Sequence, residues 1–303
     1  MTTDKYLMGI DGGGSNLRIV IATSDLVQIS SSHGSTVNPS IVGFETAQQL
    51  IRSKIQEGLT NANLTADQIS GVGIGIAGAD VNHAGEWLKR TIRHVIPNAS
   101  LALSSDYEIA LTGAIGERNG VLILAGTGSV AYGVRADGQS ILLGGWGYLL
   151  GDEGSGYWLG MEAIKACIHD IEKRGQPTSL TDAILYNHHL NKRTDLLNWI
   201  YSETRIAEIA QFATIVLDHA KQGDAVALDI VQRGAKYLAV MVNAIYKHLD
   251  TNTLPIAFAG SLLTNENPLS NRLCKHLTLA ERPIAKHSPI IGAVILARDH
   301  DHP

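Results

Sequence analysis

Two short glycine-rich loops, each placed between two strand-like runs, constrain the fold of this chain more than any other feature. The first loop, Asp11–Ser15, follows the apolar run Tyr6–Ile10 and precedes the β-branched run Leu17–Ala22. The second loop, Gly126–Ser129, lies between two further runs of the same kind. Walker A loops and dinucleotide-binding loops both lead from a strand into a helix. The sequence therefore predicts two glycine hairpins that join strands.

The remaining hydrophobic periodicity predicts a mixed α/β protein in two parts. Helices are expected at 46–59, 84–94 and 107–115, with strands at 69–79 and 100–105 between them. After the second hairpin, apolar residues at helical spacing and one late strand-like run predict elements at 157–172, 203–222, 224–249 and 256–259. A last helix, at 289–298, is apolar on all sides and should be buried. A chain of 303 residues suffices for two domains, and the restart of the pattern puts their boundary near residue 116.

Composition and charge exclude several classes of protein. The formal net charge is -5, from 24 Lys and Arg against 29 Asp and Glu, so no basic field is available for nucleic acid or anionic lipid. No apolar run approaches the roughly eighteen residues that a membrane span needs. The two cysteines, Cys167 and Cys274, are too few for a disulfide framework and fit a reducing compartment. We expect a cytoplasmic protein that binds neither nucleic acid nor membrane.

The two glycine hairpins can serve as a phosphate site. Their backbone N–H groups and the hydroxyl of Ser15 can donate to phosphate oxygens, although a single glycine hairpin with Asp11 bonded to turn amides would be an ordinary structural feature. Two such hairpins facing one another across a cleft would grip a polyphosphate, which favours a nucleoside triphosphate as ligand. Asp11 could then hold Mg²⁺ through water, with Asp152 as a rival ligand.

A carboxylate at a strand end offers acid–base chemistry. Asp106 follows Ser104 and Ser105, where a general base could accept the proton of an attacking hydroxyl. The structural alternative makes Asp106 the N-cap of the helix at 107–115, and the two roles are compatible.

The segment Gly144–Gly156 combines six glycines with Trp146, Asp152 and a second carboxylate. A tryptophan offers an apolar face to a sugar ring, and Asp152 can accept hydrogen bonds from two hydroxyls. The structural alternative makes Asp152 or Ser155 the cap of the next helix and places Trp146 in the core.

In this order and spacing, the motifs Asp11–Ser15, Leu124–Ser129 and Gly144–Ser155 resemble those of the N-acetylglucosamine kinase family. That family is grouped with the BadF/BadG/BcrA/BcrD-type ATPases in the actin, Hsp70 and sugar-kinase superfamily. The resemblance implies an α/β fold of two ribonuclease-H-like domains with ATP and sugar in the cleft between them. It implies domains at 1–115 plus 286–303 and at 116–285.

The family resemblance also implies a set of site residues. ATP would contact Gly13, Gly14, Ser15, Gly126, Thr127, Gly128, Gly260 and Ser261, with Mg²⁺ near Asp11. The sugar would contact Asn38, Gly78, Asp106, Gly145, Trp146 and Asp152. Asp106 would be the catalytic base for ATP-dependent phosphorylation of the 6-hydroxyl of an amino sugar. The resemblance favours a homodimer, whereas the sequence itself leaves the oligomeric state open.

One departure concerns Val130, which stands where animal members of the family carry Asn. A contact to an acetamido group is therefore in question. N-acetylglucosamine is the favoured substrate, with glucosamine and muramic acid as alternatives.

Two other functions compete with the kinase. An ATPase activator of the 2-hydroxyacyl-CoA dehydratase type needs cysteine thiolates for an iron–sulfur cluster, and neither Cys167 nor Cys274 lies where we expect such ligands. A sugar-sensing repressor needs a DNA-binding module, and the first predicted strand begins too early for a helix-turn-helix ahead of it.

Overall fold

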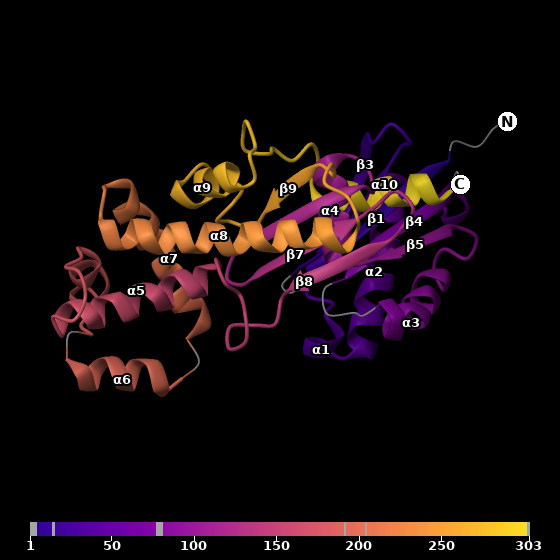
Figure 1. The fold of residues 1–303 in the computed structure, drawn as a ribbon. Helices are drawn as coiled ribbons and strands as arrows, with labels where there is room; N and C mark the ends of the chain where they lie inside the picture. Colours follow the sequence, from indigo (N-terminus) through magenta and orange to yellow (C-terminus); the bar gives the residue numbers. More distant parts are fainter. Residues whose placement is uncertain (1–4, 14–15, 77–80, 191, 204, 302–303) are drawn as a thin grey trace. The chain divides into compact units, whose positions relative to one another are not determined.

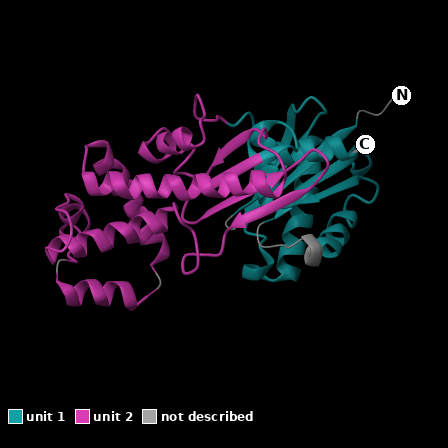
Figure 2. Ribbon diagram, viewed as in Figure 1, with its two compact units in different colours: residues 1–120, 285–303 teal, residues 121–284 magenta. Residues whose placement is uncertain are grey.

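The computed structural model describes residues 5–13, 16–76, 81–190, 192–203 and 205–301. Figure 2 shows that the chain divides into two compact units, Met1–Gly120 with Ala285–Pro303, and Val121–Ile284. Each unit is built on its own β-sheet (Figure 1). Across the described residues, none of the helices combines the length and the apolar character that crossing a membrane requires.

Unit 1 contains a five-stranded sheet in the order β3-β2-β1-β4-β5. Strand β2 runs antiparallel to both of its neighbours, β1 and β3, whereas β4 pairs in parallel with β1, and β5 pairs in parallel with β4. The strands are β1 (Tyr6–Gly12), β2 (Asn16–Ala22), β3 (Gln28–Ser35), β4 (Ile69–Ile76) and β5 (Ser100–Ser104). The helices of this unit are α1 (Pro39–Val42), α2 (Phe44–Ala62), the short η1 (Ala66–Gln68), α3 (Val81–Arg93), α4 (Asp106–Ile115) and α10 (Pro289–Asp301).

Side chains alternate across β1 and divide the core of unit 1 between the two faces of its sheet. Met8 and Ile10 pack with Ile51 of α2 in one buried cluster, whereas Leu7 packs with Val294 of α10 in another. Helix α10 is the last predicted helix, and its central residues are buried as its apolar composition predicts.

Glycines in the strands let α10 approach the sheet closely. A Cβ atom built on Gly73 of β4 would lie 1.9 Å from the carbonyl oxygen of Ala293 in α10. Gly9 of β1 and Gly71 of β4 meet the backbone of α10 in the same way. The sequence pattern predicts that the glycines of β4 permit close backbone approach, and the partner in that approach is α10.

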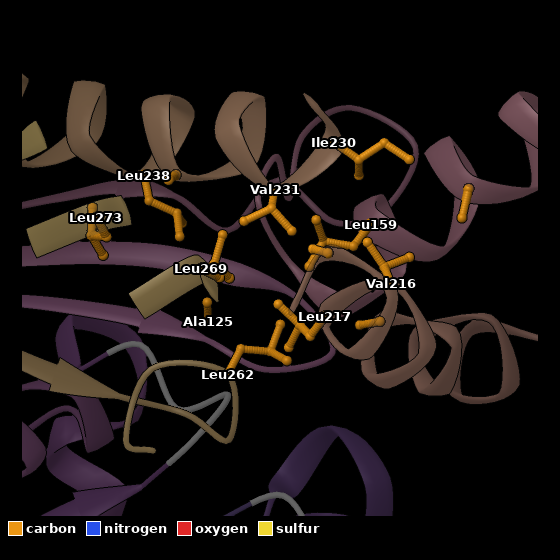
Figure 3. Packing of buried hydrophobic residues seen from close by; sticks show 14 of the residues in the cluster. Ala125, Leu159, Val216, Leu217, Ile230, Val231, Leu238, Leu262, Leu269 and Leu273 are labelled. Atoms are coloured by element: carbon orange, nitrogen blue, oxygen red, sulfur yellow. The ribbon is translucent and has the colours of Figure 1, made fainter. Parts of the chain in front are cut away.

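Unit 2 contains a four-stranded sheet in the order β8-β7-β6-β9. The strands are β6 (Gly120–Ala125), β7 (Ser129–Val134), β8 (Ser140–Gly144) and β9 (Ile256–Ala259). The helices are α5 (Gly156–Ile171), the π-helical η2 (Thr181–Tyr186), α6 (Arg193–Tyr201), α7 (Ile206–Lys221), α8 (Ala225–His248) and α9 (Pro268–His276). Figure 3 shows how Leu159 of α5, Val216 of α7 and Val231 of α8 meet in the buried core.

Both predicted hairpins are present, since β1 leads into β2 and β6 leads into β7. The sequence pattern misses β3, β8, α1 and α6. Strand β3 escapes because it is rich in serine. Its Ser30 hydroxyl donates to the carbonyl of Gly58 at 2.9 Å and its Ser32 hydroxyl to the carbonyl of Lys54 at 2.7 Å, so contacts with α2 stabilise a strand that local propensity does not favour.

Candidate active site

The first glycine loop leaves the carboxyl end of β1. A Cβ atom on Gly12 would lie 2.8 Å from Cγ2 of Val37 and 2.9 Å from Cγ1 of Ile76, so this position has room only for glycine. The N–H of Gly13 donates to the carbonyl of Asn16 at 2.9 Å and closes the hairpin. Two predicted ATP ligands of this loop, Gly14 and Ser15, lie outside the described residues.

Asp11 stands in an electrostatic environment set by two charged neighbours. It pairs in register with Arg18 of β2. Burial raises the pKa of Asp11, the positive charge of Arg18 lowers that pKa, and the negative charge of Asp106 raises it again. Because Asp106 acts on the pKa of Asp11, the structure brings together the predicted metal ligand and the predicted base.

Asp106 is the first residue of α4, and the helix is capped by its neighbour. The hydroxyl of Ser105 accepts the N–H of Glu108 at 3.1 Å, so the alternative that Asp106 is the N-cap is wrong. One carboxylate oxygen of Asp106, Oδ1, accepts the N–H of Tyr107 at 3.1 Å. Burial raises the pKa of Asp106, and the bond from Tyr107 opposes that rise. The carboxylate is therefore a stronger base than an exposed aspartate.

Asn38 lies on a segment tied to the first glycine loop. Its Oδ1 accepts the N–H of Ser40 at 2.9 Å and caps α1. Its own N–H donates to Oγ1 of Thr36 at 3.2 Å, and the Thr36 hydroxyl donates to the carbonyl of Gly13 at 3.3 Å. Thr36 thus links the predicted sugar ligand Asn38 to the first glycine loop by hydrogen bonds. Another predicted sugar ligand, Gly78, lies outside the described residues.

The second glycine loop joins β6 to β7 in unit 2. The N–H of Gly126 donates to the carbonyl of Gly128 at 2.9 Å, and Thr127 between them is exposed. Two N–H groups at the start of α5 hold the loop, since Gly156 donates to the carbonyl of Gly126 at 2.7 Å and Tyr157 to that of Thr127 at 3.2 Å. The exposed edge of the loop remains accessible to a ligand.

The segment between β8 and α5 places its predicted residues in different environments. The side chain of Trp146 is 74% exposed, so the alternative that it fills the core is wrong. The hydroxyl of Ser155 accepts the N–H of Trp158 at 3.2 Å, which confirms Ser155 as the cap of α5. Gly145 has a positive φ of 69° and donates its N–H to the carbonyl of Ser129 at 3.1 Å.

Asp152 is buried against the second glycine loop. Its side chain is 8% exposed, and its Oδ1 accepts the N–H of Ser129 at 3.2 Å. A Cβ atom on Gly128 would lie 2.8 Å from Asp152 Oδ2. In unit 2 this predicted sugar ligand therefore adjoins the predicted phosphate loop.

Gly260 and Ser261 follow β9, and Ser261 borders a hollow of about 590 Å³. Gly260 has a φ of 81°, and a Cβ atom there would lie 2.2 Å from the carbonyl oxygen of Ala125, the residue just before the second glycine loop. The hollow is lined by Ser261 and by residues of α7 and the α9 region: Thr214, Leu217, Asp218, Lys221, Leu262, Glu266, Asn267, Pro268 and Asn271. Its size and position suit the nucleoside part of a nucleotide.

The described residues offer few ligands for a metal ion. No group of three or more His, Cys, Asp or Glu side chains that could hold a metal occurs in the described part of the chain. The electrostatically coupled pair Asp11 and Asp106 remains. Mg²⁺ takes one or two carboxylates and completes its shell with water and phosphate oxygens, so this sparse set fits Mg²⁺ bound together with a nucleotide.

Comparison with known proteins identifies the family to which the chain belongs. The family model described as "BadF/BadG/BcrA/BcrD ATPase family" matches residues 8–297. The chain belongs to the BadF/BadG/BcrA/BcrD ATPase family. This membership confirms the resemblance that the glycine motifs carry.

Within the BadF/BadG/BcrA/BcrD ATPase family, the similar proteins include amino-sugar kinases. The chain is 34% identical over 301 residues to an N-acetylmuramic acid/N-acetylglucosamine kinase of Clostridium acetobutylicum, covering 97% of this chain and 98% of that protein. It is 27% identical to an N-acetyl-D-glucosamine kinase of Dictyostelium discoideum, with 97% and 98% covered. The crystal structure of a candidate N-acetylglucosamine kinase of Chromobacterium violaceum has a TM-score of 0.71 at 27% identity, with 97% and 99% covered. These matches confirm the predicted α/β fold with ribonuclease-H-like sheets.

Several residues that shape these sites belong to none of the predicted motifs. Arg18 faces Asp11 across a strand pair, and Thr36 links Asn38 to the first loop. Asp218 and Lys221 of α7 line the hollow beside Ser261. Arg18 and Thr36 carry no motif, and Asp218 and Lys221 reach the hollow only through helix packing. The strand pairing of Asp11 with Arg18 is the one relation that hairpin register could have indicated.

Proposed function

We propose that this protein is an ATP-dependent kinase that phosphorylates the 6-hydroxyl of an amino sugar, most favourably N-acetylglucosamine. The observation that carries the proposal is Asp106. Its carboxylate stands at the end of β5, is released from capping by Ser105, and has a pKa raised by burial. Similarity to proteins named as amino-sugar kinases supports the substrate class.

Asp106 would act as the general base. In phosphoryl transfer to an alcohol, a carboxylate accepts the proton of the hydroxyl as its oxygen attacks the γ-phosphorus. The raised pKa of Asp106 favours that proton transfer at neutral pH, provided that the carboxylate is ionised when the sugar binds. The proton would pass from the sugar oxygen to a carboxylate oxygen of Asp106.

The remaining predicted residues would bind and orient the two substrates. The N–H groups and hydroxyls of both glycine loops, Gly13, Gly14, Ser15, Gly126, Thr127 and Gly128, would donate to phosphate oxygens, and Gly260 with Ser261 would border the nucleoside. Asn38, Gly78, Gly145, Trp146 and Asp152 would contact the sugar. Asp11 would hold Mg²⁺, which when bound neutralises charge on the phosphoryl oxygens.

Val130 of β7 would lie beside the 2-substituent of the sugar. This side chain is 5% exposed, and a Cβ atom on Gly145 would lie 3.4 Å from its Cγ2. Val130 thus presents an apolar wall beside a predicted sugar ligand, where an amide side chain would offer hydrogen bonds. This apolar wall cannot give the acetamido group the hydrogen bond that Asn would offer, but it suits the methyl group of that substituent better than it suits a free ammonium group.

The test is phosphorylation of a sugar panel by wild type and by Asp106→Asn. The panel contains N-acetylglucosamine, glucosamine, N-acetylmuramic acid, N-acetylmannosamine and glucose, and product ADP and sugar phosphate are both measured. Wild type should turn over an amino sugar, and Asp106→Asn should lower kcat by about 10²–10⁴-fold, the usual contribution of a general base. Asp25→Asn, an exposed aspartate in unit 1, is the matched control and should keep full activity.

The competing function makes the opposite prediction in this assay. An ATPase activator would bind or hydrolyse ATP while leaving every sugar unphosphorylated, and that outcome would refute the kinase. The two thiols that an iron–sulfur cluster would need are core residues: Cys167 has its pKa raised to about 12 by burial, and Cys274 is also buried with a raised pKa. Both remain free thiols, which fits work in the reducing cytosol.

A further inference from the structure

Ser129, the first residue of β7, joins three segments of unit 2. Its N–H donates to Oδ1 of Asp152 at 3.2 Å, its carbonyl accepts the N–H of Gly145 at 3.1 Å, and its hydroxyl donates to the carbonyl of Glu153 at 2.9 Å. The residue is only 3% exposed. Because all three polar groups of this buried serine are bonded, a shift of one segment is resisted by the other two.

Among these three hydrogen bonds of Ser129, the bond to Asp152 is the one whose acceptor is a carboxylate. Its backbone has a φ of 63°, in the left-handed region that glycine favours and that Asp and Asn adopt only occasionally. Its carboxylate is buried and lies against Gly128, where a Cβ atom would be 2.8 Å from Oδ2. Strain is retained at a position only where the surroundings require it, and here the side chain is directed at the second glycine loop.

The same connection continues into α5. The N–H groups of Gly156 and Tyr157 donate to the carbonyls of Gly126 and Thr127. The segment from Gly145 to Tyr157 therefore holds the second glycine loop by hydrogen bonds to Gly126, Thr127 and Ser129. On its outer side this chain carries Trp146, which is largely exposed.

We propose that Asp152 is a positioning residue that fixes the second glycine loop for ATP, and that through Ser129 it couples this loop to the segment carrying Gly145 and Trp146. The inference rests on the proposed kinase function and deepens it. A sugar that orders Gly145 and Trp146 also orders the loop, so the loop need not lose that conformational freedom again when ATP binds. Sugar binding thereby raises the affinity for ATP.

The test measures binding of a non-hydrolysable ATP analogue with Mg²⁺, by titration calorimetry, to protein with and without N-acetylglucosamine. In Asp152→Gly the side chain is lost but the left-handed backbone is relaxed, so the fold should survive, as circular dichroism can verify. Asp152→Asn tolerates the same backbone and keeps an oxygen that can accept the N–H of Ser129. Asp152→Gly should bind the analogue at least about tenfold more weakly without sugar, a change of about 1.4 kcal/mol, and Asp152→Asn should recover most of that loss.

Asp250→Gly is the matched control. Asp250 also belongs to unit 2 and has a positive φ of 47°, but it is exposed and touches neither glycine loop. This variant should bind the analogue like wild type, and sugar should raise the affinity for the analogue in wild type and in Asp250→Gly but not in Asp152→Gly.

Two outcomes are decisive against the inference. If Asp152→Gly binds the analogue as tightly as wild type without sugar and loses only sugar affinity, Asp152 is a sugar ligand alone and the positioning role is overturned. If wild type itself fails to bind the analogue, the proposed kinase function is refuted, and the coupling that rests on it is refuted as well. The wild-type titration thus separates the two failures.

Discussion

Helix α10 rests on the backbone of α4 at Gly292, and adding one methyl group there should destabilise unit 1. A Cβ atom on Gly292 would lie 1.9 Å from the carbonyl oxygen of Ile109 and 2.5 Å from the nitrogen of Gly113. Both obstructing atoms belong to a helix backbone and cannot rotate away as a flexible side chain would. The two helices must separate by more than 1 Å before the contact reaches 3.0 Å, the shortest that real Cβ atoms show.

The magnitude follows from what this separation disrupts. Ile109, Ala293 and Leu296 pack together between the two helices and are buried. A gap of this size forfeits a quarter to a half of each dispersion contact, and overpacking a rigid site costs about 3 kcal/mol. Alanine recovers at most about 1 kcal/mol through its higher helix propensity. Gly292→Ala should therefore lower the free energy of unfolding by about 2 kcal/mol or more.

The assay is urea unfolding followed by circular dichroism, with hydrogen exchange of peptides from α4 and α10 to assign the change to unit 1. Gly58→Ala is the matched control, because it makes the same substitution inside α2, where the new Cβ would meet only Oγ of Ser32 at 3.7 Å and Cδ1 of Ile21 at 3.8 Å. That variant should be stabilised by up to about 1 kcal/mol. Equal or greater stability of Gly292→Ala relative to wild type would refute the close-packing argument.

Two further predictions concern the candidate site. Burial raises the pKa of Asp106, so the folding stability linked to its protonated form is fully present below the unfolded pKa and is lost as the pH rises through the folded pKa. Asp106→Asn should therefore unfold at a temperature a few degrees higher than wild type at pH 7, as calorimetry can measure. If this difference in unfolding temperature does not become smaller toward pH 4, the reasoning is contradicted. Gly260→Ala adds a clash with Ala125 to the strain of a positive φ and should raise the KM for ATP about tenfold, whereas Gly223→Ala, which has the strain but no neighbour within 4 Å, should leave that KM unchanged.

Turn chemistry and strand propensity made the hairpins predictable. A glycine run between two β-branched runs has few other conformations open to it, so both hairpins and most of the helices could be inferred from local sequence. The motif spacing also sufficed for the family. Capping was less certain, because Ser105 and Asp106 are adjacent and both favour N-caps, and only the position of the first helical turn decides between them.

The tertiary structure alone decided which of these residues meet. Gly71 and Gly73 of β4 are far from Ala293 of α10 in sequence. The close packing of α10 on these glycines depends on the order of strands in the sheet. The exposure of Trp146 and the burial of Asp152 likewise come from the packing of one segment against Ser129, which no periodicity encodes. Local sequence determines backbone conformation through short-range sterics, whereas the surroundings of a side chain depend on contacts between distant segments. The sequence by itself therefore predicted the two glycine hairpins and the family, whereas the folded units determined that Ser105 rather than Asp106 caps α4 and that Asp152 adjoins the second loop.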